Sequence, residues 1–346
     1  MALDWAVPGF PHEPQDEQQL LTVDGAFLTR MAKGPLRTAQ PPNKWLRGAV
    51  YDSDGLLIPA SQKIGGLGGN QGAQADPERL RPRPGARRLT GTWMYGGHWI
   101  GHFGHFFTET LTTLWPERQQ VDGLVFHAYF GGNVGIKPWQ AELMDLTGYG
   151  DLPIEVVDRE PVTVDRLVVP SRSVVVNGWA HPGAAAVWDR MVAAAGGPTP
   201  GSPERVFLSR TSFNAGLRAQ GKPTRSTEAR DRALDEVFAA SDYDVVTSEA
   251  LPVLDQVRLA AGAKVLAGCA GTALHLSAFA PAGTRVIEIG DTRSPDVQVP
   301  QQQVIDHLRG HPTAFLPASL EPADVAVALA DLAELAELAD LAATSS

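Results

Sequence analysis

The chain has one cysteine and no long uncharged apolar stretch, and each scarcity excludes a class of protein. The single thiol, Cys269, cannot form an intramolecular disulfide or a zinc site built on several cysteines. We therefore expect a reducing, cytoplasmic location. No window approaches the ~18 uncharged apolar residues of a membrane-spanning helix. Residues 1–19 lack the basic and apolar regions of a signal peptide, so none is expected.

Positive charge is also scarce, because 29 lysines and arginines stand against 39 aspartates and glutamates, for a formal net charge of -10. This balance argues against a general nucleic-acid-binding protein, which carries a basic face. The hydrophobic share of 43% and the charged share of 20% exclude wholesale disorder. A length of 346 residues predicts two domains, since a domain typically has about 150 residues.

The first predicted domain covers residues 1–197 and begins with short strands and turn-rich loops. Asp-Gly pairs at 24–25 and 54–55 each predict a hairpin turn. A Gly-, Pro- and Arg-rich stretch over 64–88 predicts a long loop. The remaining segments alternate between strand and helix, which predicts an α/β domain with a parallel or mixed sheet. Strands are predicted at 121–130, 154–158 and 165–171, and helices at 104–115, 139–148 and 181–197.

A linker at 196–204 separates this domain from a second one, predicted at 203–318. There, near-continuous apolar strands alternate with amphipathic helices, one of them with Thr227 as its N-cap. This pattern predicts a doubly wound, Rossmann-like sheet with ligands at the carboxyl ends of its strands. Residues 319–346 predict a C-terminal helix. Its leucines repeat every three residues, which favours docking on the body of the protein over a coiled coil.

Three histidines and one glutamate, His98, His102, His105 and Glu109, are spaced four, three and four residues apart. On a continuous helix all four would share one face, and such side chains can converge on a metal ion. Gly101 and Gly104 would interrupt that helix. The alternative is a general-base pair of His105 and Glu109 at a cleft. A structural role is equally open, with a core histidine and a first-turn helix-dipole partner.

A basic segment follows the first strand of the second domain. Between residues 206 and 227 there are four basic residues and no acidic one. Arg210 falls where the strand should end, and its guanidinium suits a diphosphate through bidentate hydrogen bonds. We assign Arg225 to the same anion site, and Arg218 to a solvated loop.

The stretch from Gly268 to His275 runs from an apolar strand through a glycine-bearing turn into a helix. The N–H groups of Gly271, Thr272 and Ala273 would make an anion site at the start of that helix. The stretch matches neither GxGxxG nor a Walker A loop. Glu288, which closes a later strand at the same edge, either accepts from ribose hydroxyls or faces solvent. Cys269 is expected to be a small buried residue.

Together, and in this order, these pieces resemble glycosyltransferase family 61, a group often labelled capsular polysaccharide biosynthesis proteins. The segment GHFGHFFTETLTTLW resembles the family pattern N-x-x-H-x-x-x-E/D-x-L, with His105 and Glu109 on its histidine and acid. The usual asparagine is His102 here. The second match runs from VFLSR to VIEIGD and includes Gln256 and His275.

The resemblance implies a GT-B architecture, with two Rossmann-like domains facing each other across a cleft. It implies an inverting transfer from a nucleotide sugar, by family expectation a UDP-sugar, to a hydroxyl of a glycan or polysaccharide acceptor, without a cofactor or catalytic metal. Glu109 would take the acceptor proton, with His105 as the alternative base and with His102 and Gln256 in acceptor or supporting roles. The donor and its diphosphate would be held by Arg210, Arg225, Gly271, Thr272, His275 and Glu288.

Two other functions remain open. One is a metal-dependent hydrolase that uses His98, His102, His105 and Glu109. The other is a non-catalytic protein that binds a nucleotide or a glycan. No nucleic-acid partner is expected, and membrane contact would be at most peripheral, through the arginines of residues 79–88.

Overall fold

The computed structural model describes residues 3–30, 48–63, 78–82, 85–129 and 134–344, and the chain forms two compact units. The N-terminal unit is His12–Ala194, and the C-terminal unit is Ala195–Ser346 together with Met1–Pro11. The units meet in the chain a few residues before the boundary predicted from the linker. The predicted α/β class is confirmed.

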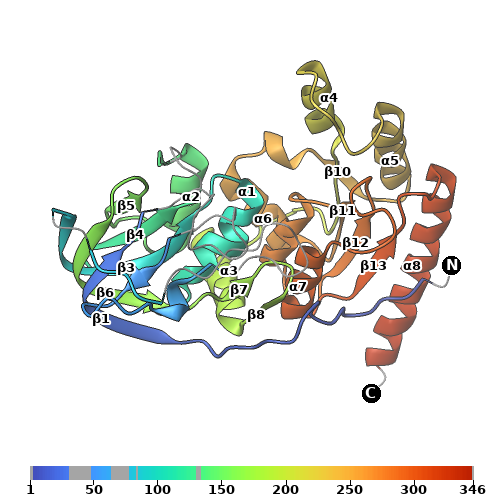
Figure 1. The fold of residues 1–346 in the computed structure, drawn as a ribbon. Coiled ribbons are helices and arrows are strands. Elements are labelled where there is room, and N and C mark those ends of the chain that lie inside the picture. Colours follow the sequence, from blue (N-terminus) through green and yellow to red (C-terminus); the bar gives the residue numbers. More distant parts are fainter. Residues whose placement is uncertain (1–2, 31–47, 64–77, 83–84, 130–133, 345–346) are drawn as a thin grey trace. The chain divides into compact units, whose positions relative to one another are not determined.

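The N-terminal unit is built on a six-stranded mixed sheet with the order β2-β1-β6-β3-β4-β5 (Figure 1). Strands β3 to β6 pair in parallel, whereas β1 is antiparallel to both of its neighbours. A mixed sheet agrees with the sequence-based prediction. The strands are β1 (Leu20–Leu28), β2 (Val50–Tyr51), β3 (Arg87–Trp99), β4 (Gly123–Ala128), β5 (Ile154–Val157) and β6 (Val162–Pro170). A hairpin of β7 (Val174–Val175) and β8 (Trp179–Ala180), helices α2 (Pro138–Leu146) and α3 (Pro182–Ala194), and the 3₁₀ turn η1 (Pro59–Ser61) complete the unit with the helical segment described next.

The segment predicted as one helix at 104–115 is helical, but its geometry changes twice. It begins as α1 (Phe103–His105), widens into the π turn η2 (Phe106–Thr110) and tightens into the 3₁₀ helix η3 (Leu111–Leu114). Every residue from Phe106 to Leu114 is buried. The segment is therefore a core helix covered on all sides.

Of the two predicted hairpin turns, one is confirmed and one is wrong. At 54–55 the chain turns, with the Gly55 N–H donating to the Asp52 carbonyl at 3.0 Å. At 24–25 it does not turn, because β1 continues through Gly25 and pairs with β6 in one register on both sides. The predicted loop over 64–88 lies partly outside the described residues, and its last two residues, Arg87 and Arg88, already pair in β3.

The C-terminal unit has a five-stranded, all-parallel sheet with the order β10-β9-β11-β12-β13. Counted within the unit this order is 2-1-3-4-5. This is the doubly wound arrangement, in which the order of the strands reverses between β9 and β11. The predicted Rossmann-like sheet is therefore confirmed. The strands are β9 (Arg205–Leu208), β10 (Asp244–Val246), β11 (Val265–Cys269), β12 (Arg285–Ile289) and β13 (Thr313–Leu316). The helices are α4 (Thr211–Ala219), α5 (Glu228–Ala240), α6 (Val253–Gly262), α7 (Pro300–Arg309) and α8 (Pro322–Thr344), with 3₁₀ turns η4 (Ser248–Ala250) and η5 (Leu274–Phe279).

Both faces of this sheet are covered. On one face, α5 and the predicted C-terminal helix α8 close an apolar cluster in which the rings of Phe207 and Phe238 stack at 4.0 Å. On the other face, Glu288 of β12 reaches the start of α7, where it accepts from the Val299 N–H. The N-cap role of Thr227 on α5 is confirmed by its hydrogen bond from the Arg230 N–H. Neither α8 nor any other helix among the described residues is long and apolar enough to cross a membrane.

Three elements of this unit were not predicted: α4, α7 and β13. Helix α4 occupies the segment that the sequence suggested to be a basic loop, and the assignment of Arg218 to a solvated loop is wrong. Its guanidinium donates to the buried Asp231 carboxylate at 2.7 Å. Asn214 of α4 donates to the same carboxylate. Helix α4 is thus held to α5 by hydrogen bonds between polar side chains. A search of the sequence for apolar periodicity does not find such contacts.

The N-terminal segment belongs to the C-terminal unit, although the predicted first domain included it. Ala6 pairs with Thr313 at the edge of β13. Trp5 packs against the apolar cluster of the sheet, and its indole N–H donates to the Leu332 carbonyl of α8 at 2.9 Å. This segment therefore adds a short antiparallel bridge to an otherwise exposed sheet edge.

Replacing Trp5 with alanine is expected to lower the free energy of unfolding of the C-terminal unit by about 2 kcal/mol, because a half-buried ring and a hydrogen bond are both lost. The matched variant Trp5→Phe keeps most of the ring and should cost only about 1 kcal/mol. Urea denaturation followed by circular dichroism measures both. Equal stability of all three proteins would show that the segment is only loosely attached.

Candidate functional site

The first candidate site lies in the N-terminal unit, around a buried carboxylate. Glu109 is 5% exposed and lies in the π turn η2. One of its oxygens pairs with the Lys63 ammonium, and the other with Nδ1 of His105, one turn earlier on the same helical segment. Both oxygens are therefore engaged, and only 4% of the side chain is exposed.

These partners keep Glu109 charged. Burial by itself raises the pKa of a carboxyl group, because a low dielectric disfavours the anion. Lys63 and His105 outweigh this cost and lower the pKa of Glu109 to about 2. At neutral pH the group is thus a carboxylate, which accepts hydrogen bonds and donates none.

The local helix geometry separates the two members of this pair. His105 ends the α-helical turn, and 43% of its side chain is exposed. Glu109 lies within the following π turn, a form frequent at functional sites. Thr110 fastens this turn to β3 by donating to the His98 carbonyl at 2.7 Å. When Nδ1–H donates to Glu109, a neutral His105 carries its lone pair on Nε2.

A second group of polar side chains lies near the pair of His105 and Glu109. Arg172, which follows β6, donates to Nδ1 of the buried His98 and, at 2.9 Å, to the Gln62 carbonyl. His127 hydrogen-bonds to the Tyr95 hydroxyl and the Thr29 carbonyl, each at 2.8 Å. Burial lowers the pKa of His127 to about 3, so this imidazole is neutral at physiological pH.

This arrangement does not fit a metal site built on the four residues of the spacing pattern. A guanidinium occupies Nδ1 of His98, and Lys63 occupies one oxygen of Glu109. His102 is the N-cap of α1, with its ring 5.1 Å from that of His105. In the part of the chain that the structure describes, no three His, Cys, Asp or Glu side chains are placed to share a metal ion.

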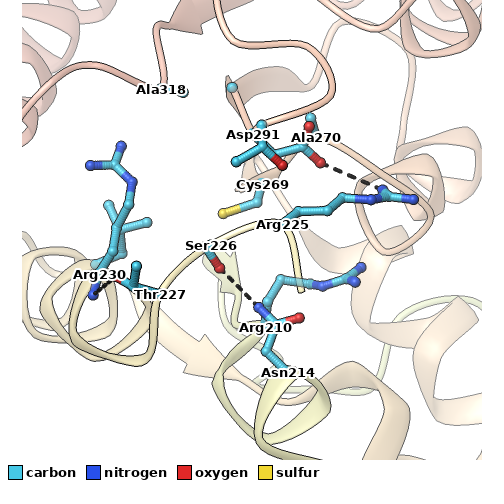
Figure 2. A pocket seen from close by; sticks show the side chains of 13 residues that line it. Arg210, Asn214, Arg225, Ser226, Thr227, Arg230, Cys269, Ala270, Asp291 and Ala318 are labelled. Atoms are coloured by element: carbon cyan, nitrogen blue, oxygen red, sulfur yellow. Dashed lines mark hydrogen bonds and ion pairs between the residues drawn. The ribbon is translucent and has the colours of Figure 1, made fainter. Parts of the chain in front are cut away.

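The second candidate site lies in the C-terminal unit, at the carboxyl ends of β9, β11 and β12. Arg210 follows β9, and Figure 2 shows its side chain and that of Arg225 extending toward the same side of a pocket. Among the described residues, the Arg210 side chain has no hydrogen-bond or ion-pair partner, only the ring of Phe213 at 4.4 Å. Burial lowers the pKa of Arg210, and the neighbouring Arg225 lowers it further. A cation held there without a counter-ion favours an anionic ligand. The pocket is lined by Arg210, Asn214, Arg225, Ser226, Thr227, Arg230, Leu234, Cys269, Ala270, Gly290, Asp291, Thr292 and Ala318.

A third arginine, Arg293, belongs to the same cluster. Arg225 and Arg293 both lie near the Asp291 carboxylate, at 3.5 and 3.9 Å. Burial lowers the pKa of Arg293, and repulsion from Arg225 and from Arg210 lowers it as well. Asp291 and Glu249 are the acids that act on Arg210, and the three arginines outnumber them at this edge of the sheet.

Gly271 places backbone against this cluster. It has φ of +141°, a conformation that side chains rarely allow. A Cβ atom there would lie 3.4 Å from the Arg225 guanidinium and 3.7 Å from that of Arg210. The turn therefore lies at the reversal point between β9 and β11, where ligands bind in doubly wound sheets.

The other predicted donor residues are placed less directly. Thr272 follows Gly271 in the turn before η5, but it is not among the pocket-lining residues. His275 is buried and hydrogen-bonds to Gln302 at 2.8 Å. Gln256 is buried on α6, where it donates to the Leu251 carbonyl. Glu288 is fully buried and does not face solvent. Their contact with a ligand stays a prediction.

Cys269 lines the pocket, and burial raises the pKa of its thiol to about 12. The thiol therefore stays protonated and is not a nucleophile at neutral pH. The sequence predicted a small buried residue, whereas the side chain of Cys269 is only partly buried where it lines the pocket.

The charged residues of the two sites that were not singled out from the sequence include Lys63, Arg172 and Arg293. Arg172 and Arg293 each follow the end of a strand, the position that drew attention to Arg210. The same rule could have found them. Lys63 precedes a glycine-rich stretch and carries no such signal, since its partner lies 46 residues away.

Comparison with known proteins identifies a family for the chain. The model of the family described as Glycosyltransferase 61 matches residues 103–287, which is more than half of the chain. The match begins at α1 and ends in β12, and it includes His105, Glu109, Arg210, Arg225 and Gly271. A search of curated proteins finds none that matches the chain. The chain therefore belongs to glycosyltransferase family 61.

Proposed function

We propose that the protein is an inverting glycosyltransferase of GT-B type, which moves a sugar from a nucleoside diphosphate to a hydroxyl of a glycan or polysaccharide. The observation that carries this proposal is the guanidinium of Arg210 beside Arg225 and the Gly271 turn, without a hydrogen-bond or ion-pair partner in the described part of the chain. A diphosphate has the charge and the oxygen geometry that such arginines bind best. A UDP-sugar is the first donor to test, and a capsular polysaccharide is one acceptor of the proposed class.

In this proposal the arginine cluster acts on the leaving group. As the bond between the anomeric carbon and the diphosphate breaks, negative charge grows on the phosphate oxygens. Arg210, Arg225 and Arg293 and the backbone of Gly271 would stabilise that charge in place of a divalent cation. Neither a metal nor a cofactor is then required for the reaction.

The acceptor is activated by His105 rather than by Glu109. Nε2 of His105 takes the proton of the acceptor hydroxyl, and the oxygen forms its bond to the anomeric carbon. The bond to the diphosphate breaks with its electron pair on the departing phosphate, so a single displacement inverts the configuration. Glu109 holds the imidazole through Nδ1 and stabilises the imidazolium that forms. Its own oxygens are buried and already paired with Lys63 and His105, which favours His105 as the group that touches the acceptor.

The test is a transfer assay with panels of UDP-, GDP- and TDP-sugars and of oligosaccharide acceptors, each with and without chelator. We expect one donor to release its nucleoside diphosphate at a rate that chelator leaves unchanged. Nuclear magnetic resonance of the product should show inverted anomeric configuration. Binding of a diphosphate without turnover would show a non-catalytic binding protein. Retention of configuration would refute the single displacement.

A further inference from the structure

We propose that Lys63 is a positioning residue for the reaction: its ammonium keeps the dyad of Glu109 and His105 without a proton on Nε2 of the imidazole. The role of His105 as base rests on the proposed function. The effect of Lys63 on the protonation of the dyad is argued only from the contacts of Glu109 with Lys63 and with His105. Lys63 lies outside the segment that matches the family.

Burial makes this ammonium necessary. Glu109 and Lys63 are 5% and 9% exposed, so neither charge is solvated by bulk water. A buried carboxylate without a cation tends to bind a proton, because the neutral form avoids the cost of desolvation. Lys63 contacts one oxygen of Glu109 and supplies the opposite charge.

One further proton can bind to the dyad on Glu109 or on His105. In either place it leaves Nε2 of His105 unable to act as a base. If Glu109 binds it, the carboxylic acid donates to Nδ1, and the neutral imidazole then carries its own proton on Nε2. If His105 binds it, the imidazolium carries protons on both nitrogens. Only a carboxylate facing a neutral imidazole leaves the lone pair on Nε2. A nearby positive charge favours this form, because it has one proton fewer.

The other charged neighbours do not replace Lys63. Among the described residues, the charged groups that act on Glu109 include Lys63 from the segment after η1, His105 from its own helical segment, and Arg172 from the segment after β6. Arg172 donates to His98 and to the Gln62 carbonyl. Lys63 is the cation that contacts the second carboxylate oxygen, and its ammonium also lies 5.4 Å from the ring of Tyr129.

The test uses the full chain with Lys63→Met, which removes the charge at similar size, and Lys63→Arg, which keeps it. Lys264→Met is the matched control, because Lys264 forms an exposed pair with Glu204.

Histidine ¹⁵N resonances are recorded from pH 5 to 9, and those of His105 are assigned by their loss in His105→Gln. In the wild type and in Lys63→Arg, the neutral imidazole should carry its proton on Nδ1. In Lys63→Met, the loss of the Nε2 proton should move up by about 1–3 pH units. An unchanged titration in a folded Lys63→Met protein would overturn the proposal.

Kinetics give an independent measurement. In Lys63→Met, kcat at pH 7 should fall by about a hundredfold, and raising the pH should restore much of it. A merely structural defect would not be rescued by alkaline pH.

If Lys63→Met does not fold, the double variant Lys63→Met/Glu109→Gln removes both buried charges, and it should be no slower than Glu109→Gln alone. A further loss in the double variant would contradict the proposal. If the resonances shift as expected but His105→Gln keeps full activity, the proposed base is wrong and the role of Lys63 in the dyad stands.

Discussion

Replacing His105 with glutamine is expected to lower kcat by about 10²–10⁴-fold, the usual contribution of a general base. The donor KM should change little, because the arginine cluster that would hold the donor belongs to the other compact unit. Glutamine keeps a polar side chain of similar reach but cannot accept the acceptor proton at neutral pH. Initial rates at saturating donor and acceptor measure the effect.

The matched control for this substitution is His12→Gln, since His12 is an exposed histidine of the same unit. It should leave both kinetic constants unchanged. A loss of less than about tenfold in His105→Gln would show that another group, or water, takes the proton. Glu109→Gln should lower kcat while leaving donor affinity unchanged, because Glu109 acts through His105.

The second large effect concerns stability and pH. Two of the buried carboxyl groups of the C-terminal unit, Glu288 and Asp306, have no exposed surface. Glu288 accepts from the Val299 N–H at 3.1 Å, and its other oxygen has no hydrogen-bond partner among the described residues. Burial raises the pKa of Glu288 to about 8. Burial also raises the pKa of Asp306 to about 7, although Gln302, Thr313 and Gln298 donate to its oxygens and offset part of the effect.

The direction follows from proton linkage. Between the carboxyl pKa of an unfolded chain, about 4, and the raised pKa of the folded state, the folded state binds more protons. Its stability therefore falls as pH rises, by about 1.4 kcal/mol per pH unit for each such group. His311 acts in the opposite direction below about pH 6.5, because burial lowers its pKa to about 4. The clear window for the two acids is thus pH 6.5 to 8.

In that window we expect the C-terminal unit to lose about 2–3 kcal/mol, most of it through Glu288. Glu288→Gln stays neutral and should flatten the dependence. Glu236→Gln is the matched control, because Glu236 is exposed on α5. Hydrogen exchange of β11 to β13 at several pH values measures the change in the unit itself. A wild-type protein whose stability does not change from pH 6.5 to 8 would show that these carboxyl groups are solvated by water.

Four of the five strands of the C-terminal sheet, β9 to β12, were predictable, because they are short apolar runs that alternate with amphipathic helices. Helix α4 was not, since Asn214 and Arg218 hold it to Asp231 by hydrogen bonds. The docking of Trp5 on α8 was not predictable either, because residues more than 300 positions apart leave no local pattern.

The candidate sites likewise contain residues that could be predicted from the sequence and residues that could not. His105 and Glu109 are one helical turn apart, and Arg210 follows a strand, so local spacing was enough to find them. The assignment of the base was left open between Glu109 and His105, since burial cannot be read from spacing. Lys63 was missed because a buried ion pair between distant segments has no sequence signature.

The most direct test of the account is the binding of nucleoside diphosphates by isothermal titration calorimetry, with chelator present. We expect UDP, GDP or TDP to bind the wild type and to bind Arg210→Ala about 10–100-fold more weakly, because a charge-assisted hydrogen bond is lost. Arg232→Ala should bind like the wild type, since Arg232 is exposed on α5 and pairs with Glu228. If none of the three diphosphates binds, or if Arg210→Ala binds as tightly as the wild type, the arginine cluster is not the donor site and the account fails.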